Sequence, residues 1–411
     1  MRLLLCCGVS MSTKVTCRQC QSSFAAAPHL YGKTVACPNC QAPIAIPQPN
    51  APAPAPMPQL GSGSPYAMPM ASPVASSPTR AGRAGKDSSS ARTIVIILSV
   101  IGGGFVLLVV CSGILVAVAM RSLSRPPQTD FANLMEGRKG FSTALTRREK
   151  AEYPAPAPPN GIFQLDKYRS PAGELDAYVS PSPGDGQKHP AMIWVFGGFD
   201  NSIGETAWES ASPDNDQSAS AFREAGLVMM YPSFRGGNMN PGNIEGFYGE
   251  VDDLLAAADH LAKKDYVDPQ RIYLGGHSTG GTMVMLAAAA TNRFRAVFAF
   301  GPVDDVSGYG ADMLPFSPWN EKEVSLRNPI QWLHAMKSPV FVFEGSSGNI
   351  SCLRNMRRAS TNPQLHFHEV RRADHFSILA PATAVVAGKI RQDTGASCNI
   401  QFSDEEIGSR F

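Results

Sequence analysis

A serine set between glycines is the first feature of the chain with chemical meaning. The run from Gly276 to Gly280 reads Gly-His-Ser-Thr-Gly and places Ser278 at its centre. A short apolar run (271–274) precedes it, and a longer one (283–290) follows. A strand, a tight glycine-rich turn and a helix form the context that a G-x-S-x-G nucleophile elbow requires. The pattern predicts that Ser278 is the nucleophile of an acyl transfer; the alternative is a simple turn between a strand and a helix.

Backbone amides near this serine are predicted to form an oxyanion hole. Gly197, Gly198 and Phe199 follow the apolar run 191–196. In the fold that this pattern suggests, the loop at that point supplies one N–H group, and the residue after the nucleophile, Thr279, supplies the other. The first donor is Gly198 or Phe199, and both stay open at this stage.

His375 is the predicted general base. It follows the run 365–370 and precedes the segment 382–390, and the loop after a final strand reaches the nucleophile in this kind of fold. The acid that orients this histidine is less well defined. Glu344, at the tip of the run 339–343, is the favoured carboxylate. The alternatives are Asp304, Asp305, Asn349 and a Ser–His dyad without an acid.

The elements that must position these residues lie within 161–411, a segment of about 250 residues and an ordinary length for one α/β domain. Helices are predicted over 250–264, over 382–390 and after the elbow. Strands that alternate with helices predict a doubly wound, mostly parallel sheet, opened by an antiparallel pair. The runs that predict strands are 162–165, 175–179, 191–196, 226–231, 271–274, 296–300, 339–343 and 365–370.

Sites in such a sheet lie at the carboxyl ends of the strands, and each catalytic candidate follows a predicted strand. Arg235 also follows one, the run 226–231. Its guanidinium would bind a substrate carboxylate with two hydrogen bonds or, alternatively, make a structural ion pair.

Four cysteines near the amino terminus have the spacing of a zinc site. Cys17 and Cys20 form one C-x-x-C pair, and Cys37 and Cys40 form another. Two such pairs can complete a tetrahedral four-thiolate site, which is closed to substrate and therefore structural. We predict a zinc ribbon over 11–46, with two disulfides or a redox pair as the alternative. Met11 is an alternative start of the chain.

The middle of the chain predicts a membrane anchor. Residues 47–92 are rich in Pro, Ser and Gly and predict a disordered linker. Residues 93–120 carry no charge and exceed the roughly 20 residues that cross a bilayer; the alternative is a buried core helix. Residues 121–160 are interpreted as a juxtamembrane spacer.

The orientation follows from charge and from cysteine chemistry. Basic residues before the span favour a cytoplasmic amino terminus, and a thiolate cluster needs a reducing compartment. The predicted hydrolase domain would then lie outside the cytoplasm, where Cys352 and Cys398 would be able to pair. The net charge of +2 gives no reason to expect a nucleic-acid partner.

The segment 161–395 resembles the α/β-hydrolase fold and, more narrowly, the prolyl oligopeptidase family of serine peptidases. The resemblance implies Ser–His–Asp catalysis on peptides, with esterases and acylaminoacyl hydrolases as neighbours. Two departures stand out. The family's acid comes three residues after the glycine that matches Gly345, where this chain has Gly348, and the family's β-propeller has no room here. The motifs that carry the resemblance are Phe234-Arg-Gly236, Gly249-Glu-Val-Asp-Asp253, Val267-Asp-Pro-Gln-Arg-Ile272, Gly276-His-Ser-Thr-Gly280, Gly301-Pro-Val-Asp304 and Asp374-His-Phe376.

The sequence thus predicts a membrane-anchored serine hydrolase that acts on a peptide or an ester, with structural zinc and no cofactor for catalysis. The alternative is a catalytically silent, hydrolase-like binding or sensor domain tethered to the membrane.

Overall fold

The computed structural model describes residues 13–19, 23–26, 33–36, 42–46, 128–209 and 211–408. All of these residues belong to one unit of the chain, 1–49 with 126–411. The predicted linker (47–92) and the predicted span (93–120) lie outside the described residues. Among the residues that are described, none of the helices combines the length and the apolar character needed to cross a bilayer.

Near the amino terminus the described residues form two short antiparallel hairpins. Strand β1 (Thr13–Thr16) pairs with β2 (Ser23–Ala26), and β3 (Thr34–Ala36) pairs with β4 (Pro43–Ala45). Cys17 follows β1 and is buried. The other three predicted zinc ligands, Cys20, Cys37 and Cys40, lie outside the described residues, so the zinc ribbon stays a prediction.

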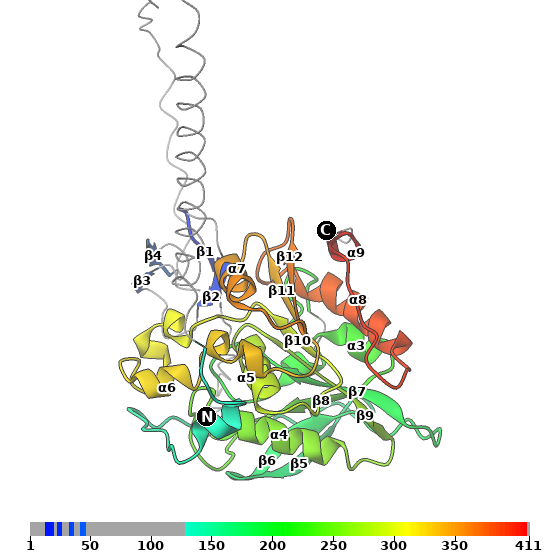
Figure 1. Cartoon of the computed structure of the whole chain (residues 1–411). Coiled ribbons are helices and arrows are strands. Elements are labelled where there is room, and N and C mark those ends of the chain that lie inside the picture. Colours follow the sequence, from blue (N-terminus) through cyan, green and yellow to red (C-terminus); the bar gives the residue numbers. More distant parts are fainter. Residues whose placement is uncertain are drawn as a thin grey trace, which may run out of the picture. The chain divides into compact units, whose positions relative to one another are not determined.

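An eight-stranded sheet forms the centre of the large domain, in the order β12-β11-β10-β9-β7-β8-β6-β5 (Figure 1). Strands β5 and β6 pair antiparallel, as β6 and β8 do, and the other neighbours are parallel. The predicted mostly parallel sheet with an antiparallel opening pair is confirmed. The strands are β5 (Gln164–Ser170), β6 (Gly173–Val179), β7 (His189–Val195), β8 (Val228–Pro232), β9 (Val267–His277), β10 (Val297–Phe300), β11 (Val340–Gly345) and β12 (Leu365–Val370).

Helices cover the sheet and connect its strands. The α-helices are α2 (Leu134–Arg138), α3 (Ser220–Glu224), α4 (Gly249–Leu261), α5 (Thr279–Ala290), α6 (Glu321–Ser325), α7 (Ile350–Ala359), α8 (Leu379–Gln392) and α9 (Asp404–Gly408). Short 3-10 turns are η2 (Glu205–Ala207), η3 (Val306–Tyr309), η4 (Ala311–Met313), η5 (Pro329–Gln331) and η6 (Leu333–Ala335).

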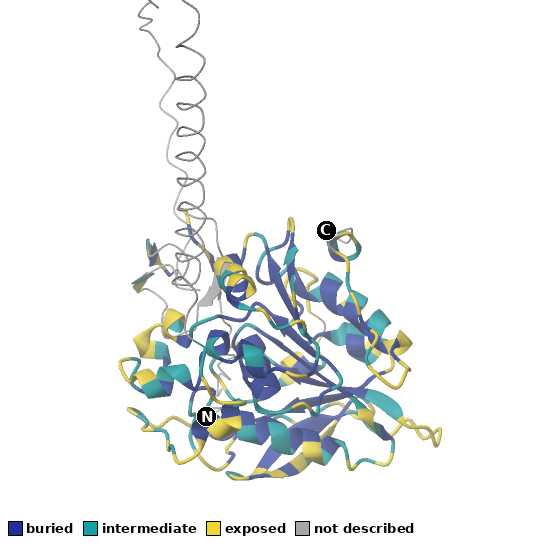
Figure 2. Cartoon of the chain, in the orientation of Figure 1, coloured by how far each residue is buried: buried dark blue, intermediate teal, exposed yellow. Residues whose placement is uncertain are grey.

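Apolar clusters lie on both faces of the sheet, and Figure 2 shows the central strands as buried. Successive strand residues point to opposite faces, so in β10 Val297 and Ala299 join one cluster while Phe298 and Phe300 join the other. The first cluster includes α4 and α5, and the second includes residues of α3 and α8. A sheet covered on both faces explains why its strands are continuous apolar runs rather than alternating ones.

The predicted spacer 121–160 is wrong from residue 128 onward, because this segment packs against the domain. We call residues 128–160 the strap. Leu134 is 1% exposed, and the guanidinium of Arg138 donates to both carboxylate oxygens of Asp252 at 3.1 and 2.8 Å. The amide of Ala151 donates to the carbonyl of Gly236 at 2.6 Å. The charges that suggested a solvated segment are therefore partly used in contacts with distant parts of the chain.

The buried side chain of Arg327 holds the middle of the strap. Its guanidinium donates to the Thr143 hydroxyl at 2.7 Å and to the Glu323 carboxylate at 2.5 Å. The same carboxylate accepts from the amide of Ala144 at 2.6 Å. Arg327 is fully buried, and a buried charge is tolerated when its partners are as complete as these.

The sequence left open whether Cys352 and Cys398 pair, and the structure shows no disulfide between them. Both cysteines are free thiols. Cys352 packs against the first apolar cluster and Cys398 against the second, so the two thiols belong to opposite sides of the sheet.

Candidate active site

Ser278 stands between the end of β9 and the start of α5, in a backbone conformation that few residues adopt. Its φ is 57° and its ψ is −116°. A Cβ at Gly276 would lie 2.6 Å from the carbonyl oxygen of Gly280, and a Cβ at Gly280 would lie 2.6 Å from that of Phe196. Only glycine fits at both positions, so these residues allow the tight turn. Ser278 itself is only partly buried, so a substrate can reach it.

His375 and Glu344 form a buried pair near this serine. The Nδ1 atom of His375 lies 3.0 Å from Oε2 of Glu344, and the two residues are 2% and 1% exposed. Glu344 is the next-to-last residue of β11, and its Oε1 accepts a hydrogen bond from the amide of Gly345 at 2.7 Å. With Nδ1 facing the carboxylate, Nε2 of His375 is the nitrogen that remains for proton transfer.

Gly301 connects this pair to the nucleophile. It follows Phe300, whose carbonyl accepts a hydrogen bond from the amide of Ser278 at 2.7 Å. A Cβ at Gly301 would lie 2.6 Å from Nδ1 of His375 and 3.0 Å from Oε2 of Glu344. The carboxyl ends of β9, β11 and β12 therefore bring Ser278, Glu344 and His375 to one corner of the sheet, beside Gly301 at the end of β10. Within the described residues no hydrogen bond joins the Ser278 hydroxyl to His375, and catalytic contacts of this kind often tighten only when substrate binds.

The structure explains the departure at Gly348. A Cβ there would lie 2.7 Å from the carboxyl carbon of Glu344 and 3.0 Å from the amide nitrogen of His375. The carboxylate of Glu344 thus fills the space beside position 348. A longer acid at the strand tip occupies the place where the resemblance expects a shorter acid in the loop.

The other candidate acids are used elsewhere. The carboxylate of Asp304 accepts from the amide side chain of Asn355 at 2.8 Å. Asp305 caps the turn η3, accepting from the amide of Ser307 at 2.8 Å. Asn349 is the N-cap residue of α7. Glu344 is the carboxylate that contacts the ring of His375.

Two of the three predicted oxyanion donors line one small pocket. Gly198 and Thr279 both line it, together with Phe196, Asn201 and Met283. The Thr279 hydroxyl donates to the carbonyl of Gly198, which holds the loop against the first turn of α5. None of the backbone hydrogen bonds between described residues uses the amide of Gly198, Phe199 or Thr279 as a donor. These amides are available to a developing oxyanion.

His277 is a buried residue of this corner to which the sequence analysis assigned no role. It is 1% exposed, and its Nε2 lies 2.9 Å from the carbonyl oxygen of His375. Its Nδ1 contacts the side chain of Gln217 at 3.0 Å, and its ring centroid is 4.6 Å from that of His375. Burial, and then the neighbouring His375, lower the pKa of His277 well below its usual value. A neutral ring that donates from Nε2 would hold the main chain of His375 in place. The sequence signal that could have pointed to His277 is its position inside the G-x-S-x-G run, directly before Ser278.

The guanidinium of Arg235 is engaged by carboxylates of the chain itself. Its guanidinium donates twice to Asp253, with both contacts at 2.9 Å, and once to Glu245 at 2.8 Å. A Cβ at Gly249 would lie 2.6 Å from Nε of Arg235, so that glycine makes room for the side chain. These contacts favour the structural ion pair over carboxylate binding.

An aromatic cluster borders the nucleophile. The rings of Phe199 and Phe247 lie 5.0 and 5.8 Å from that of Tyr309, measured between centroids. The Tyr309 hydroxyl contacts that of Thr282 at 2.8 Å, and Thr282 contacts the carbonyl of Ser278 at 3.3 Å. The partly exposed rings of this cluster, Phe199 and Tyr309, come from the loop after β7 and from η3, and Phe247 is buried behind them.

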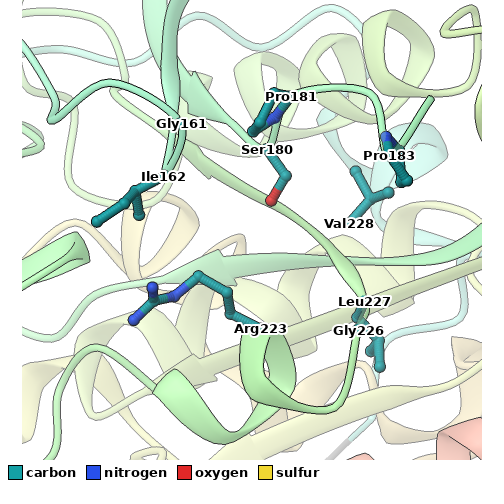
Figure 3. Close-up of a pocket in the computed structure, with 9 residues that line it drawn as sticks. All are labelled: Gly161, Ile162, Ser180, Pro181, Pro183, Arg223, Gly226, Leu227 and Val228. Atoms are coloured by element: carbon teal, nitrogen blue, oxygen red, sulfur yellow. The ribbon is translucent and has the colours of Figure 1, made fainter.

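A larger pocket of about 270 Å³ is separate from this corner (Figure 3). Ser180, Arg223 and Val228 line it, with Val228 at the amino end of β8. Because β8 and β9 each run parallel to β7, this pocket lies at the opposite edge of the sheet from Ser278. None of the predicted site residues lines it.

Residues 213–346 match the profile of the prolyl oligopeptidase family. The uncharacterized peptidase YuxL of Bacillus subtilis is 28% identical over 116 residues, a stretch that covers 25% of this chain and 18% of that protein. The matched family region carries Ser278 and Glu344. Together with the geometry above, the match supports a serine hydrolase.

Three solved structures are also similar. An acylaminoacyl peptidase of Pyrococcus horikoshii is 15% identical with a TM-score of 0.47, covering 60% of this chain and 43% of that one. A puromycin-hydrolyzing peptidase of Mycobacterium tuberculosis is 17% identical with a TM-score of 0.47, covering 59% and 41%. An esterase of Pyrobaculum calidifontis is 15% identical with a TM-score of 0.42, covering 57% and 86%. The chain spans less than half the length of the two peptidases, and at these values the likeness assigns no activity to it.

Proposed function

We propose that the domain hydrolyses an acyl compound through Ser278, His375 and Glu344. Nε2 of His375 takes the hydroxyl proton as Ser278 attacks the carbonyl carbon, and the carbonyl oxygen becomes an oxyanion. The amides of Thr279 and of Gly198 or Phe199 stabilise that oxyanion. His375 then protonates the leaving amine or alcohol, and an acyl-enzyme remains.

Water completes the cycle. His375 removes a proton from the water that attacks the acyl-enzyme, and it returns the proton to Ser278 as the carboxylic acid leaves. Glu344 holds His375 in the productive tautomer and stabilises the imidazolium that forms in both steps. The observation that carries the proposal is the buried contact of 3.0 Å between His375 and Glu344 next to the strained serine.

The proposed substrate is a peptide or an ester. The family match over 213–346 supports a peptide, and the mechanism treats an ester in the same way. The partly exposed rings of Phe199 and Tyr309 offer an apolar surface beside Ser278, which favours acyl groups with an apolar side chain.

We further propose that residues 93–120 anchor the domain to a membrane, with the amino terminus in the cytoplasm and the hydrolase domain on the other side. The support is the uncharged length of that segment and the distribution of basic residues around it. Zinc held by Cys17, Cys20, Cys37 and Cys40 would stabilise the amino-terminal ribbon.

Labelling of the full chain with a fluorophosphonate tests the hydrolase proposal. We expect one labelled serine, which disappears in Ser278→Ala and survives in the matched control Ser307→Ala, a substitution in η3. Absence of labelling in the folded wild-type protein would refute the proposal and favour the silent binding domain.

A further inference from the structure

Three large apolar side chains stand exposed on neighbouring segments. Trp319, just before α6, is 89% exposed, and Phe131 and Met135, at the start of the strap, are each 41% exposed. Lys322 joins the two segments, since its ammonium lies 5.1 Å from the ring centroid of Phe131 and donates to the carbonyl of Gly137 at 3.0 Å. Figure 1 shows α6 beside the strap. We call Phe131, Met135 and Trp319 the apolar patch.

Exposure of a tryptophan to this extent is costly in water, because its indole is largely apolar. Trp194 and Trp332 follow the usual behaviour and are buried at 0% and 1% exposure. Exposed apolar residues that gather in one place mark a surface that meets another phase or another molecule.

The short length of chain between the predicted span and the patch indicates that a membrane, rather than another molecule, covers the patch. Residues 121–127 are all that separate the predicted span from Gln128, and seven residues reach at most about 25 Å when fully extended. Phe131 and Met135 come only a few residues later. If 93–120 crosses a bilayer, the patch cannot be far from the bilayer surface.

We propose that the apolar patch rests in the interfacial layer of the membrane that anchors the chain. This inference rests on the proposed anchor at 93–120 and is independent of catalysis. Tryptophan and phenylalanine favour the level of the lipid headgroups, where the ring is shielded and the indole N–H keeps a polar partner. The patch thereby gives the tethered domain a preferred orientation.

The charges around the patch indicate the kind of lipid. The acidic side chains of Asp130, Glu136 and Glu321 are exposed beside it, as is the basic Lys139. Among the described residues beside the patch, this mixture does not form the basic cluster that binds anionic lipid. We therefore expect contact with a neutral phosphatidylcholine surface, little affected by salt, because burial of apolar surface drives it.

The fluorescence of Trp319 tests the proposal in the full chain. The protein has four tryptophans, Trp194, Trp208, Trp319 and Trp332. Wild type and Trp319→Phe are reconstituted into phosphatidylcholine vesicles, and the difference between their spectra is the emission of Trp319. The control is the corresponding difference for Trp208→Phe, since Trp208 is partly buried and outside the patch.

Replacing the lipid by its brominated form should quench the Trp319 difference signal and leave the Trp208 signal unchanged. The comparison sample is the chain in a mild detergent that is then diluted, where the surface of the domain is free. Aqueous iodide should quench Trp319 less in the vesicles than in this sample. Quenching of Trp319 by iodide but not by brominated lipid would overturn the proposal. Protection from both quenchers would also overturn it and would indicate a protein cover, such as a second copy.

Failure of the anchor is distinguishable from failure of the hydrolase. Release of the chain from vesicles by alkaline carbonate would overturn both the anchor and the patch proposal. Fluorophosphonate labelling of Ser278 in the same samples reports separately on the hydrolase.

Discussion

Replacement of Glu344 by glutamine is the most informative single change in the site. In the wild type, Oε1 of Glu344 accepts from the amide of Gly345 at 2.7 Å, and Oε2 faces Nδ1 of His375 at 3.0 Å. In Glu344→Gln the remaining oxygen must stay at the Oε1 position, because the Gly345 amide can only donate. The new NH₂ group then faces Nδ1 of His375 and donates to it.

That donor reverses the tautomer of the catalytic histidine. When Nδ1 accepts a hydrogen bond, the ring proton moves to Nε2, which can no longer take the proton of Ser278. A wrong tautomer in a Ser–His–Asp triad lowers kcat by about 10⁴, and at about 1.36 kcal/mol per factor of ten this is about 5.4 kcal/mol of transition-state stabilisation. We expect a comparable loss here, because the pair is buried and water cannot take the place of the carboxylate.

The second-order rate of fluorophosphonate labelling measures this loss, with thermal melting as the control for folding. A second pair of variants, in which the acid is moved from position 344 to position 348, makes the test more specific. A Cβ at position 348 would lie 2.7 Å from the carboxyl carbon of Glu344, and Gly348 does not have a positive φ, so shortening Glu344 makes room for an aspartate there once the amide of His375, 3.0 Å from the same Cβ, shifts by a few tenths of an ångström. We expect Glu344→Ala to lose labelling, and Glu344→Ala with Gly348→Asp to recover much of it.

Two results would refute the reasoning. Labelling of Glu344→Gln within about tenfold of the wild type would mean that the carboxylate does not set the tautomer, since the wrong tautomer costs about 10⁴. Failure of the double variant to exceed Glu344→Ala, with both variants folded, would mean that the space beside position 348 is not the position of the acid.

Four further predictions follow from other contacts. His277→Phe removes the donor to the carbonyl of His375 and should cost about 1–3 kcal/mol of stability together with a slower labelling rate, whereas His277→Gln should retain more of both; equal labelling rates in the two variants would argue against a positioning role. Arg327→Met leaves Glu323 buried without its partner and should cost about 3–5 kcal/mol in denaturant unfolding; a loss below that range would mean that the strap is held by other contacts. Burial raises the pKa of Glu250 above its unfolded value, so the wild type should lose stability relative to Glu250→Gln as pH rises through that pKa, and a difference in Tm that stays constant from acid to neutral pH would contradict this. Metal analysis of the full chain should find one zinc, absent from Cys37→Ser, and zinc bound equally by both proteins would exclude the ribbon site.

The elements around Ser278 were predictable because their signals are local. A strand, a glycine turn and a helix follow one another within a few residues, and the positive φ of Ser278 is what such a turn imposes. The sequence did not decide whether Glu344 is the acid that contacts His375, because the position of a carboxylate at the end of a strand does not reveal its direction. The structure favours it through the missing side chain at Gly348, a relation across four residues that appears only when the loop is folded.

Contacts between distant segments explain what the sequence did not reveal. Arg235 follows a strand on the site side, yet its partners, Asp253 and Glu245, come from the next helix and the loop before it. His277 acts through a carbonyl 98 residues away. The periodic pattern of apolar residues in the sequence predicts neither contact, since each depends on a single donor and a single acceptor.

The strap is a longer segment whose contacts with distant residues the sequence also did not reveal. Its charged composition is that of a solvated spacer, but Arg138 meets Asp252, and Thr143 and Ala144 meet Glu323. Its later part reaches the oxyanion loop, where the Tyr153 hydroxyl donates to Asp200 at 2.5 Å. A segment that would leave the membrane as a flexible tether is instead part of the folded domain and touches the loop that carries Gly198 and Phe199. The domain should therefore be expressed from residue 128, because a chain that starts at 161 lacks Leu134 in the core and the partners of Asp252 and Glu323.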